Sequence, residues 1–194
     1  ADRHHDCDIL LDQNWFGDST AYRYQGLIPA ECVVLVGPAY ALLRPEYATL
    51  RALMSPRDGD VRRLLVFLGG GDPTNETAKV LDALAQPGLP HLLVDVVIGV
   101  NHPDPEDVAR RAARINGRIH SGLPSLAGLM ARADLMISAG GSTSWERMCL
   151  GLPAIVISIA DNQMSTNVAL HAGGYVDFLG CLLYTSDAAD DTPC

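Results

Sequence analysis

From residue 61 onward, short continuous apolar runs alternate with segments in which apolar residues recur every three or four positions. Continuous apolar runs are typical of strands buried on both faces, and the longer period is typical of amphipathic helices. The pattern predicts strands over 61–69, 91–99, 118–122, 134–139 and 153–158, with a further strand beginning over 175–179. It predicts helices over 76–86, 105–115, 123–133, 142–151 and 162–174.

This alternation predicts an α/β fold, with a parallel sheet covered by helices on both faces in a Rossmann-like architecture. Counted from residue 61, the doubly wound strand order 3-2-1-4-5 makes the first and fourth strands neighbours. Each of these two strands runs into a glycine-rich loop, at 69–71 and at 140–141. We therefore expect the two loops to meet at the carboxyl edge of the sheet.

The segments on either side follow different patterns. In the first, strand-like runs at 7–12 and 31–37 precede an extended turn into a helix over 40–55, and the polar residues 55–60 are typical of a linker. We interpret 1–58 as the remnant of a preceding Rossmann-like domain and 59–180 as one nearly complete domain. Residues 181–194 resemble the read-through of a sequencing adapter, so we expect a non-native tail and a chain that is a fragment at both ends.

Composition narrows the classes of partner. The net charge is −9, with 14 Lys and Arg against 23 Asp and Glu, and no basic stripe is present. This charge argues against a nucleic-acid or anionic-membrane partner. Apolar runs such as 91–100 are too short to span a bilayer. The five cysteines have no regular spacing, so we expect a reducing, cytoplasmic location.

The two glycine-rich loops carry the main chemical signal. Glycine lets backbone N–H groups and the positive end of a helix dipole converge on a phosphate without a basic side chain. Two such loops at one sheet edge indicate a diphosphate and hence a nucleotide-linked substrate. A tight turn without a ligand is the alternative for the first loop. The candidate residues are Gly69, Gly70, Gly71 and Thr74, which caps the next helix or contacts phosphate, and Gly140, Gly141, Ser142 and Thr143.

Two further positions each leave two interpretations open. Glu146 lies about one turn into the helix after the second loop, where its carboxylate can accept hydrogen bonds from a ribose diol. The alternative is a capping box formed by Thr143 and Glu146. Asn162 and Gln163 follow the strand over 153–158 and offer donors and acceptors to a sugar. The alternative there is Asp161 as the cap of the next helix.

Other chemistry-bearing residues form no recognisable site. The segment at 4–8 contains histidine, cysteine and aspartate, but its spacing fits no familiar set of metal ligands, so no metal site is predicted. We interpret Cys149 as a core residue and His120 and His171 as structural. No Ser-His-Asp constellation can be assembled from spacing.

Several of these motifs resemble a known family. The segment SAGGSTSWERMCLGLPAIVISIADNQ at 138–163 resembles the donor-nucleotide motif of the two-domain GT-B family. The segments HHDCDILLDQN at 4–14, YQGLIPAECVVLVGPAYALLRPEY at 24–47 and FLGGGDPTNET at 67–77 are similar to the UDP-2,4-diacetamido-2,4,6-trideoxy-β-L-altropyranose hydrolases of pseudaminic acid biosynthesis, a pathway of flagellin glycosylation. The resemblance covers residues 4–180 and implies a GT-B-like fold in which 59–180 is the UDP-binding C-terminal domain.

The resemblance also implies roles for individual positions. Both glycine loops would contact the diphosphate, Ile98 and the neighbouring backbone the uracil, Glu146 the ribose, and Asn162 and Gln163 the sugar. Residues 40–44 would lie at the cleft between the two domains. The partner implied is a UDP-sugar, with no cofactor, metal, nucleic acid or membrane, and we expect a monomer.

The family reaction is hydrolysis of the anomeric C–O bond by water, with inversion and release of UDP. The water-activating histidine of the family lies in a G-x-G-H motif near the native N-terminus, and this sequence contains no G-x-G-H. We therefore expect no catalytic residue within this chain, and we expect it to bind UDP weakly and to turn over substrate negligibly. The alternatives are a GT-B glycosyltransferase, against which residues 4–47 argue, and a non-catalytic nucleotide-binding module.

Overall fold

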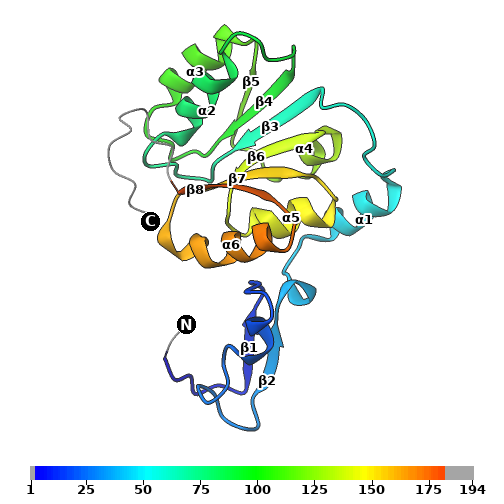
Figure 1. Ribbon diagram of the computed structural model, residues 1–194, viewed down its shortest axis with the longest axis vertical. Helices are drawn as coiled ribbons and strands as arrows, with labels where there is room; N and C mark the ends of the chain where they lie inside the picture. The colour runs from blue at the N-terminus through cyan, green and yellow to red at the C-terminus, as the bar shows by residue number, and fades with distance from the viewer. Residues whose placement is uncertain (1–2, 182–194) are drawn as a thin grey trace.

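The computed structural model describes residues 3–181, which form two sheets (Figure 1). The larger sheet has six parallel strands in the order β5-β4-β3-β6-β7-β8, and the smaller has two, β1 and β2, also parallel. The strands are β1 (Ile9–Asp12), β2 (Val33–Val36), β3 (Arg63–Phe67), β4 (Leu93–Ile98), β5 (Arg118–Ser121), β6 (Leu135–Ala139), β7 (Ala154–Ser158) and β8 (Asp177–Cys181).

The predicted order of the first five strands of the larger sheet is confirmed, and β8 extends the sheet beyond β7. Strands β3 and β6 are neighbours, with Phe67 opposite Ser138 near their carboxyl ends. The two glycine-rich loops therefore leave adjacent strands at the same edge of the sheet.

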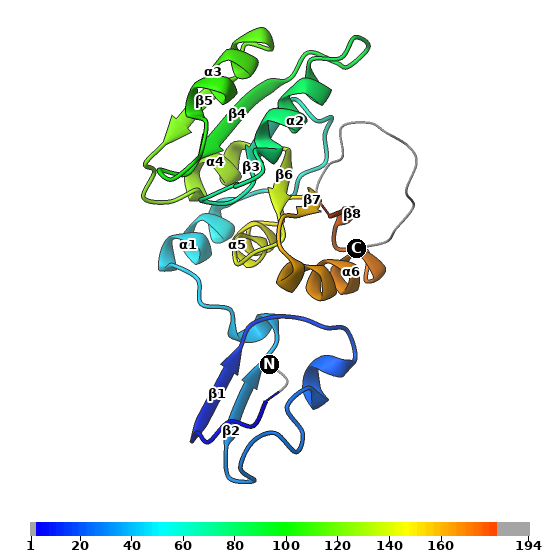
Figure 2. The ribbon, with the colours of Figure 1, turned by 90° about the vertical axis from the view of Figure 1, so that its left-hand side faces the viewer.

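Helices cover both faces of the larger sheet, as predicted (Figures 1 and 2). On one face, Val80 of α2 and Val108 of α3 pack in one cluster with Leu64 of β3. On the other face, Trp145 of α5 packs in a second cluster with Leu65, the next residue of β3, because successive strand residues point to opposite faces. Helices α1, α4 and α6 contribute to this second cluster as well. The helices are α1 (Pro45–Leu53), α2 (Glu76–Leu84), α3 (Pro105–Arg114), α4 (Ala127–Arg132), α5 (Thr143–Cys149) and α6 (Met164–Ala172), with short 3-10 turns η1 (Ser19–Tyr22), η2 (Pro38–Tyr40) and η3 (Asp161–Gln163).

Two of the predicted helices begin later than expected. Helix α4 begins at Ala127 rather than at 123, because Pro124 interrupts the segment and the Ser125 hydroxyl accepts a hydrogen bond from Ala127 N at 3.1 Å. The helix predicted over 162–174 opens with the 3-10 turn η3 and becomes α-helical only from Met164.

The predicted linker at 55–60 is held against the larger sheet's helices by one arginine. The Arg57 guanidinium donates to Ala133 O at 2.9 Å and to Met130 O at 2.8 Å, near the end of α4, and also to Leu150 O at the end of α5. A cation at the carboxyl ends of two helices satisfies carbonyls that have no partner within the helix.

The smaller sheet meets the larger part through an aromatic contact. Trp15, in the segment after β1, lies edge-to-face against Tyr175 with ring centroids 5.2 Å apart. Gly173 leaves room for this contact, because a Cβ there would come within 2.7 Å of the Trp15 ring. The boundary between 58 and 59 stays a prediction, and most of the predicted non-native tail, residues 182–194, lies outside the described residues.

None of the helices within residues 3–181 combines the length and the apolar character that crossing a bilayer would require.

Candidate functional site

A cavity of about 450 Å³ opens at the carboxyl edge of the larger sheet, where β3, β4 and β6 end. Its volume falls in the range typical of small-molecule sites. Five segments supply its walls: the start of α1, the end of β3 with the first glycine loop, the end of β4, the loop before α4, and the start of α5. The lining residues are Arg44, Phe67, Gly70, Val97, Ile98, Gly99, Val100, Asn101, Gly122, Leu123, Pro124, Ser125, Leu126, Ser142, Thr143 and Glu146.

The structure brings some of the predicted site residues together in this cavity and leaves others outside its lining. Those that line it come from both glycine loops, from β4 and from α5: Gly70, Ile98, Ser142, Thr143 and Glu146. Those that do not line it are Gly69, Gly71, Thr74, Gly140, Gly141, Asn162 and Gln163. The expected meeting of the two loops in one cavity is therefore observed, whereas the individual ligand contacts stay predictions.

Two glycines near the cavity are required by the packing of the chain itself. A Cβ on Gly99 would lie 1.8 Å from Gly70 O, so the end of β4 and the first loop touch backbone to backbone. A Cβ on Gly140 would lie 2.0 Å from Asn167 Nδ2, and Asn167 donates to Ser158 Oγ at 2.8 Å. Gly140 thus makes room for a buried side chain of α6. The sequence pattern did not single out Gly99.

Three other loop glycines have no such internal reason. A Cβ on Gly70, Gly71 or Gly141 would meet no atom within 4 Å, and none of the three has the left-handed backbone conformation that favours glycine. Gly69 differs from them because its φ is +92°. Open space beside the backbone of Gly70 leaves that backbone accessible from the cavity.

The first glycine loop is anchored by two side chains in left-handed conformations, Asp72 (φ 40°) and Asn75 (φ 53°). Asp72 is buried, and its carboxylate accepts from Glu76 N at 2.8 Å and from Thr77 N at 2.9 Å. Asn75 Oδ1 accepts from Ala78 N. These contacts cap α2, so the expectation that Thr74 caps this helix is wrong, and Thr74 is exposed. Asp and Asn tolerate the left-handed region, which was the available sequence signal.

The second glycine loop leads into α5 without a capping side chain. Ser142 directly precedes the helix, and no side-chain capping hydrogen bond is formed there. The capping-box alternative for Thr143 and Glu146 is therefore wrong. Both hydroxyls and the Glu146 carboxylate line the cavity instead.

Helix α1 adds two residues to the surroundings of Glu146. The pKa of Glu146 is raised, mainly by burial. The Tyr47 hydroxyl and the Arg44 guanidinium lower this pKa, and the charge of Glu46 raises it further. The Tyr47 side chain is buried, and burial followed by the charge of Glu146 raises the pKa of Tyr47 to about 12. Arg44 lies one residue before α1 and Tyr47 three residues further, so one helical turn presents both. The sequence pattern alone had assigned neither residue a role.

The pair after β7 lies apart from the cavity lining. Gln163 Oε1 accepts from Ile159 N at 3.1 Å, and Asn162 is exposed. Neither η3 nor α6 has a capping side chain, so the alternative in which Asp161 caps the next helix is wrong. A sugar contact for Asn162 and Gln163 stays a prediction.

The lining of the cavity includes both apolar and polar groups. Phe67, Val97, Leu123 and Leu126 are apolar, and the polar groups among the described lining residues are the loop backbone, three hydroxyls, one amide, one cation and one carboxylate. A ligand with a flat apolar ring and an anionic group suits such a mixed lining. Open backbone amides and hydroxyls bind phosphate oxygens, and a carboxylate accepts from neighbouring hydroxyls.

Comparisons with known proteins give the context for this site. Residues 67–189 match the family model described as Glycosyltransferase family 28 C-terminal domain. The spore coat polysaccharide biosynthesis protein SpsG of Bacillus subtilis (strain 168) is 35% identical over 132 residues, which are 67% of this chain and 39% of that protein. The UDP-2,4-diacetamido-2,4,6-trideoxy-beta-L-altropyranose hydrolase of Campylobacter jejuni subsp. jejuni serotype O:2 is 26% identical over 172 residues, which are 88% of this chain and 60% of that protein.

Among solved structures, the MurG protein of Acinetobacter baumannii matches with a TM-score of 0.55 and 17% identity. The match covers 88% of this chain and 52% of that protein, and at this identity it shows a shared fold only. The matched region of this chain spans 39% of SpsG and 60% of the hydrolase, so both relatives are considerably longer than the part compared.

Proposed function

Since the chain belongs to the glycosyltransferase family 28 C-terminal domain family, we propose that it binds the nucleoside diphosphate of a nucleotide-sugar in the cavity at the carboxyl edge of its larger sheet. One observation carries this proposal. Gly70 from the first loop and Ser142 and Thr143 from the second line the same cavity, and Glu146 lines it too. Converging backbone and hydroxyl groups suit a diphosphate, and a nearby carboxylate suits a ribose diol.

In this proposal the nucleotide lies across the cavity with its base toward β4. The uracil contacts Ile98 and the backbone that follows it, and the ribose hydroxyls donate to Glu146. The diphosphate contacts the Gly70 backbone and the hydroxyls of Ser142 and Thr143. Arg44 supplies the positive charge that offsets the diphosphate, because it is the one cation among the described lining residues. We assign the remaining loop glycines and Thr74 to the diphosphate. We assign Asn162 and Gln163 to the sugar.

For the whole protein we propose hydrolysis of a UDP-sugar, specifically UDP-2,4-diacetamido-2,4,6-trideoxy-β-L-altropyranose. Water forms a bond to the anomeric carbon, the bond from that carbon to the diphosphate oxygen breaks, and UDP leaves with the electron pair. A base accepts the proton of the water, and the loops stabilise the charge on the departing diphosphate. The supporting observation is that the similarity to the Campylobacter jejuni hydrolase covers 88% of this chain, including the segments before residue 61.

Sugar transfer is the second candidate activity. It is favoured by the description of the matching family, which names a glycosyltransferase. It is also favoured by the 35% identity to SpsG, a polysaccharide biosynthesis protein, which is higher than the 26% identity to the hydrolase. In transfer, an acceptor hydroxyl takes the place of water, and the same nucleotide contacts serve. The two candidates therefore share the site and differ in the nucleophile.

Nucleotide binding is tested by calorimetric titration of UDP into this chain and its Glu146→Gln variant. We expect the variant to bind about ten- to a hundredfold more weakly, because charge-assisted hydrogen bonds to the ribose contribute roughly 1.5–3 kcal/mol. Glu106→Gln, at an exposed position on α3, is the matched control and should leave the affinity unchanged. Equal affinities for the wild type and Glu146→Gln would contradict the ribose assignment.

The nucleophile is tested with the whole protein in water labelled with oxygen-18. Hydrolysis with attack at the anomeric carbon places the label in the released sugar and needs no acceptor. Transfer releases UDP only when an acceptor is present and leaves the product without label. Label in UDP rather than in the sugar would contradict both candidates.

A further inference from the structure

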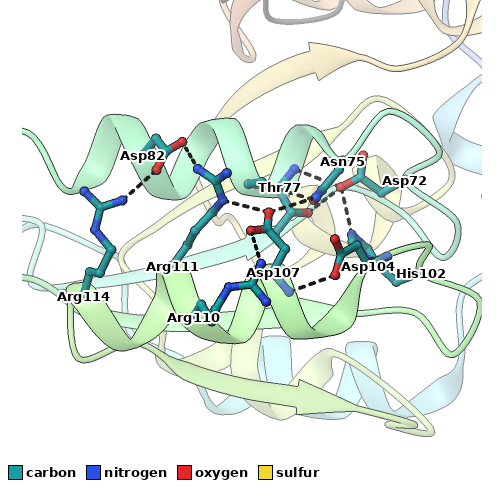
Figure 3. Close-up of polar contacts among 11 residues, drawn as sticks. Asp72, Asn75, Thr77, Asp82, His102, Asp104, Asp107, Arg110, Arg111 and Arg114 are labelled. Atoms are coloured by element: carbon teal, nitrogen blue, oxygen red, sulfur yellow. Dashed lines mark hydrogen bonds and ion pairs between the residues drawn. The ribbon is translucent and has the colours of Figure 1, made fainter.

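The loop after β3 and the loop after β4 are in direct contact beside the cavity, and a buried histidine lies at this contact. The backbones of Gly70 and Gly99 approach so closely that a side chain at Gly99 would collide with Gly70 O. His102 N donates to Gly99 O at 3.1 Å, and only 1% of the His102 side chain is exposed. Figure 3 shows His102 beside Asp72, which belongs to the first loop.

The hydrogen bonds of His102 define where its proton lies. Nδ1 accepts a hydrogen bond from Asp104 N at 3.2 Å, so Nε2 carries the proton of the neutral ring. Nε2 lies 3.5 Å from Asp72 Oδ2, beyond ordinary hydrogen-bond contact, so the attraction between them is mainly electrostatic. His102 thus presents an N–H group to a buried carboxylate of the other loop.

Asp72 is held from the other side by α2. Its carboxylate accepts from Glu76 N, from Thr77 N and, at 2.6 Å, from Thr77 Oγ1. A second link runs parallel to the histidine contact, because Asn75 Nδ2 donates to Asp107 Oδ2 of α3 at 3.4 Å (Figure 3). The first glycine loop is therefore fixed at its carboxyl end by contacts to both α2 and the β4–α3 connection.

We propose that His102 is a positioning residue, which holds the first glycine loop against the end of β4 and so fixes the Gly70 backbone where it meets the diphosphate. This inference rests on the proposed function. Neither His102 nor Asp72 lines the cavity, so both act through Gly70. Three consecutive glycines leave the loop 69–71 with much conformational freedom, and a loop ordered before binding loses less entropy when the ligand arrives.

The test compares UDP with uridine, because only UDP carries the diphosphate. In His102→Ala we expect the dissociation constant for UDP to rise about tenfold, since a small displacement of a preorganised group weakens its contacts, while that for uridine stays unchanged. Hydrogen exchange of the unliganded variant should rise over residues 69–75. His102→Gln, which keeps an N–H group at the position of Nε2, should restore the UDP affinity to near the wild-type value.

Val108→Ala is the matched control, because Val108 is fully buried on α3 and lies outside the cavity lining. It should lower the melting temperature without changing the ratio of UDP to uridine affinity. If His102→Ala weakens UDP and uridine equally, or if Val108→Ala changes the ratio as much, His102 is merely structural and the inference is overturned.

The two proposals fail in different ways. Wild-type protein that binds no UDP overturns the proposed function together with the positioning role, even if hydrogen exchange shows that His102 orders the loop. Wild-type protein that binds UDP, with a His102→Ala variant unchanged in the affinity ratio and in exchange over 69–75, overturns the inference alone.

Discussion

At the scale of single residues, the glycines around the cavity separate into two groups with different physical causes. Gly99 and Gly140 are required by neighbouring atoms of the chain itself, the Gly70 carbonyl and the Asn167 side chain. Gly70 and Gly141 are required by neither packing nor backbone conformation. A glycine that the fold does not need raises the conformational entropy lost on folding and so lowers stability. A ligand that approaches the backbone closely would explain this cost.

This distinction predicts opposite effects on stability for alanine substitutions at Gly70 and Gly99, two glycines whose backbones touch. Gly70→Ala should keep or slightly raise the melting temperature, because alanine at an unstrained site stabilises by about 0.4–1 kcal/mol, but it should weaken UDP binding. Gly99→Ala should destabilise the chain by about 1–3 kcal/mol through its collision with Gly70 O. Thermal unfolding and calorimetry measure both. A Gly70→Ala variant as unstable as Gly99→Ala would show that the two glycines do not differ in this way.

The sequence predicted part of the cavity lining. Gly70, Ser142, Thr143 and Glu146 belong to local signals, glycine-rich loops and a nearby carboxylate, and all four line the cavity, whereas seven other predicted site residues do not. Arg44 reaches the same cavity from α1, about a hundred residues earlier in the chain than Glu146. Such a contact depends on how α1 packs against α5, which no local pattern reports.

At the scale of elements, periodicity predicted the type and order of strands and helices, because buried parallel strands and amphipathic helices leave distinct patterns. The starts of two helices were predicted less well, because local side-chain hydrogen bonds influence them, whereas α2 begins at Glu76 as predicted. Ser125 accepts from Ala127 N at the late start of α4, and Gln163 accepts from Ile159 N in the turn that precedes α6. Periodicity does not report these individual bonds.

Strand β4 carries the clearest electrostatic element, a buried aspartate inside the sheet. Asp95 is 2% exposed and contacts Arg63 of β3 at 3.0 Å and His120 of β5 at 2.7 Å, with Arg132 of α4 at 3.4 Å. Burial, the largest single influence, raises the pKa of Asp95, but the hydrogen bonds to His120 and Arg63 and the charge of Arg132 together outweigh it. The pKa of Asp95 is therefore lower than in the unfolded chain.

A lowered folded-state pKa fixes the direction of the pH dependence. The stabilisation from Asp95 is fully present above the unfolded pKa, near 4, and is lost as the pH falls through the lower folded value. Asp95→Asn should reduce the free energy of unfolding by about 2–3 kcal/mol at pH 7, because it leaves cations without their partner, and by less at pH 3. Urea unfolding at several pH values measures this. Asp58→Asn, at an exposed linker position, is the control, and a loss for Asp95→Asn that is the same at pH 3 and pH 7 would contradict the assignment.

At the scale of the whole molecule, the smaller sheet depends on its contacts with the larger part. A two-stranded sheet is marginally stable by itself, and Ile9 (62% exposed) and Val33 (53% exposed) show how little of this one is covered. The Trp15–Tyr175 contact joins it to the turn between α6 and β8. The segment between β2 and α1 connects the two parts (Figure 2). Arg44, at the end of that segment, lines the cavity. The other lining residues all follow residue 61 in the chain.

This arrangement predicts that Trp15→Ala loosens the smaller sheet and leaves the proposed nucleotide site largely intact. An edge-to-face aromatic pair contributes about 0.5–1.5 kcal/mol in addition to the free energy from its buried area. For a two-stranded sheet, this is a large share of the free energy that keeps it folded against the larger part. Limited proteolysis should cut the variant faster within residues 13–37, while UDP affinity changes less than about threefold, because only Arg44 reaches the cavity from before residue 61. Trp15→Phe keeps a ring against Tyr175 and should be cut more slowly than Trp15→Ala, and Tyr22→Ala removes an exposed aromatic ring as the control. If Trp15→Ala instead abolishes UDP binding and lowers the melting temperature in one transition, the two sheets unfold as a single cooperative unit, and the smaller sheet must be counted as part of the site.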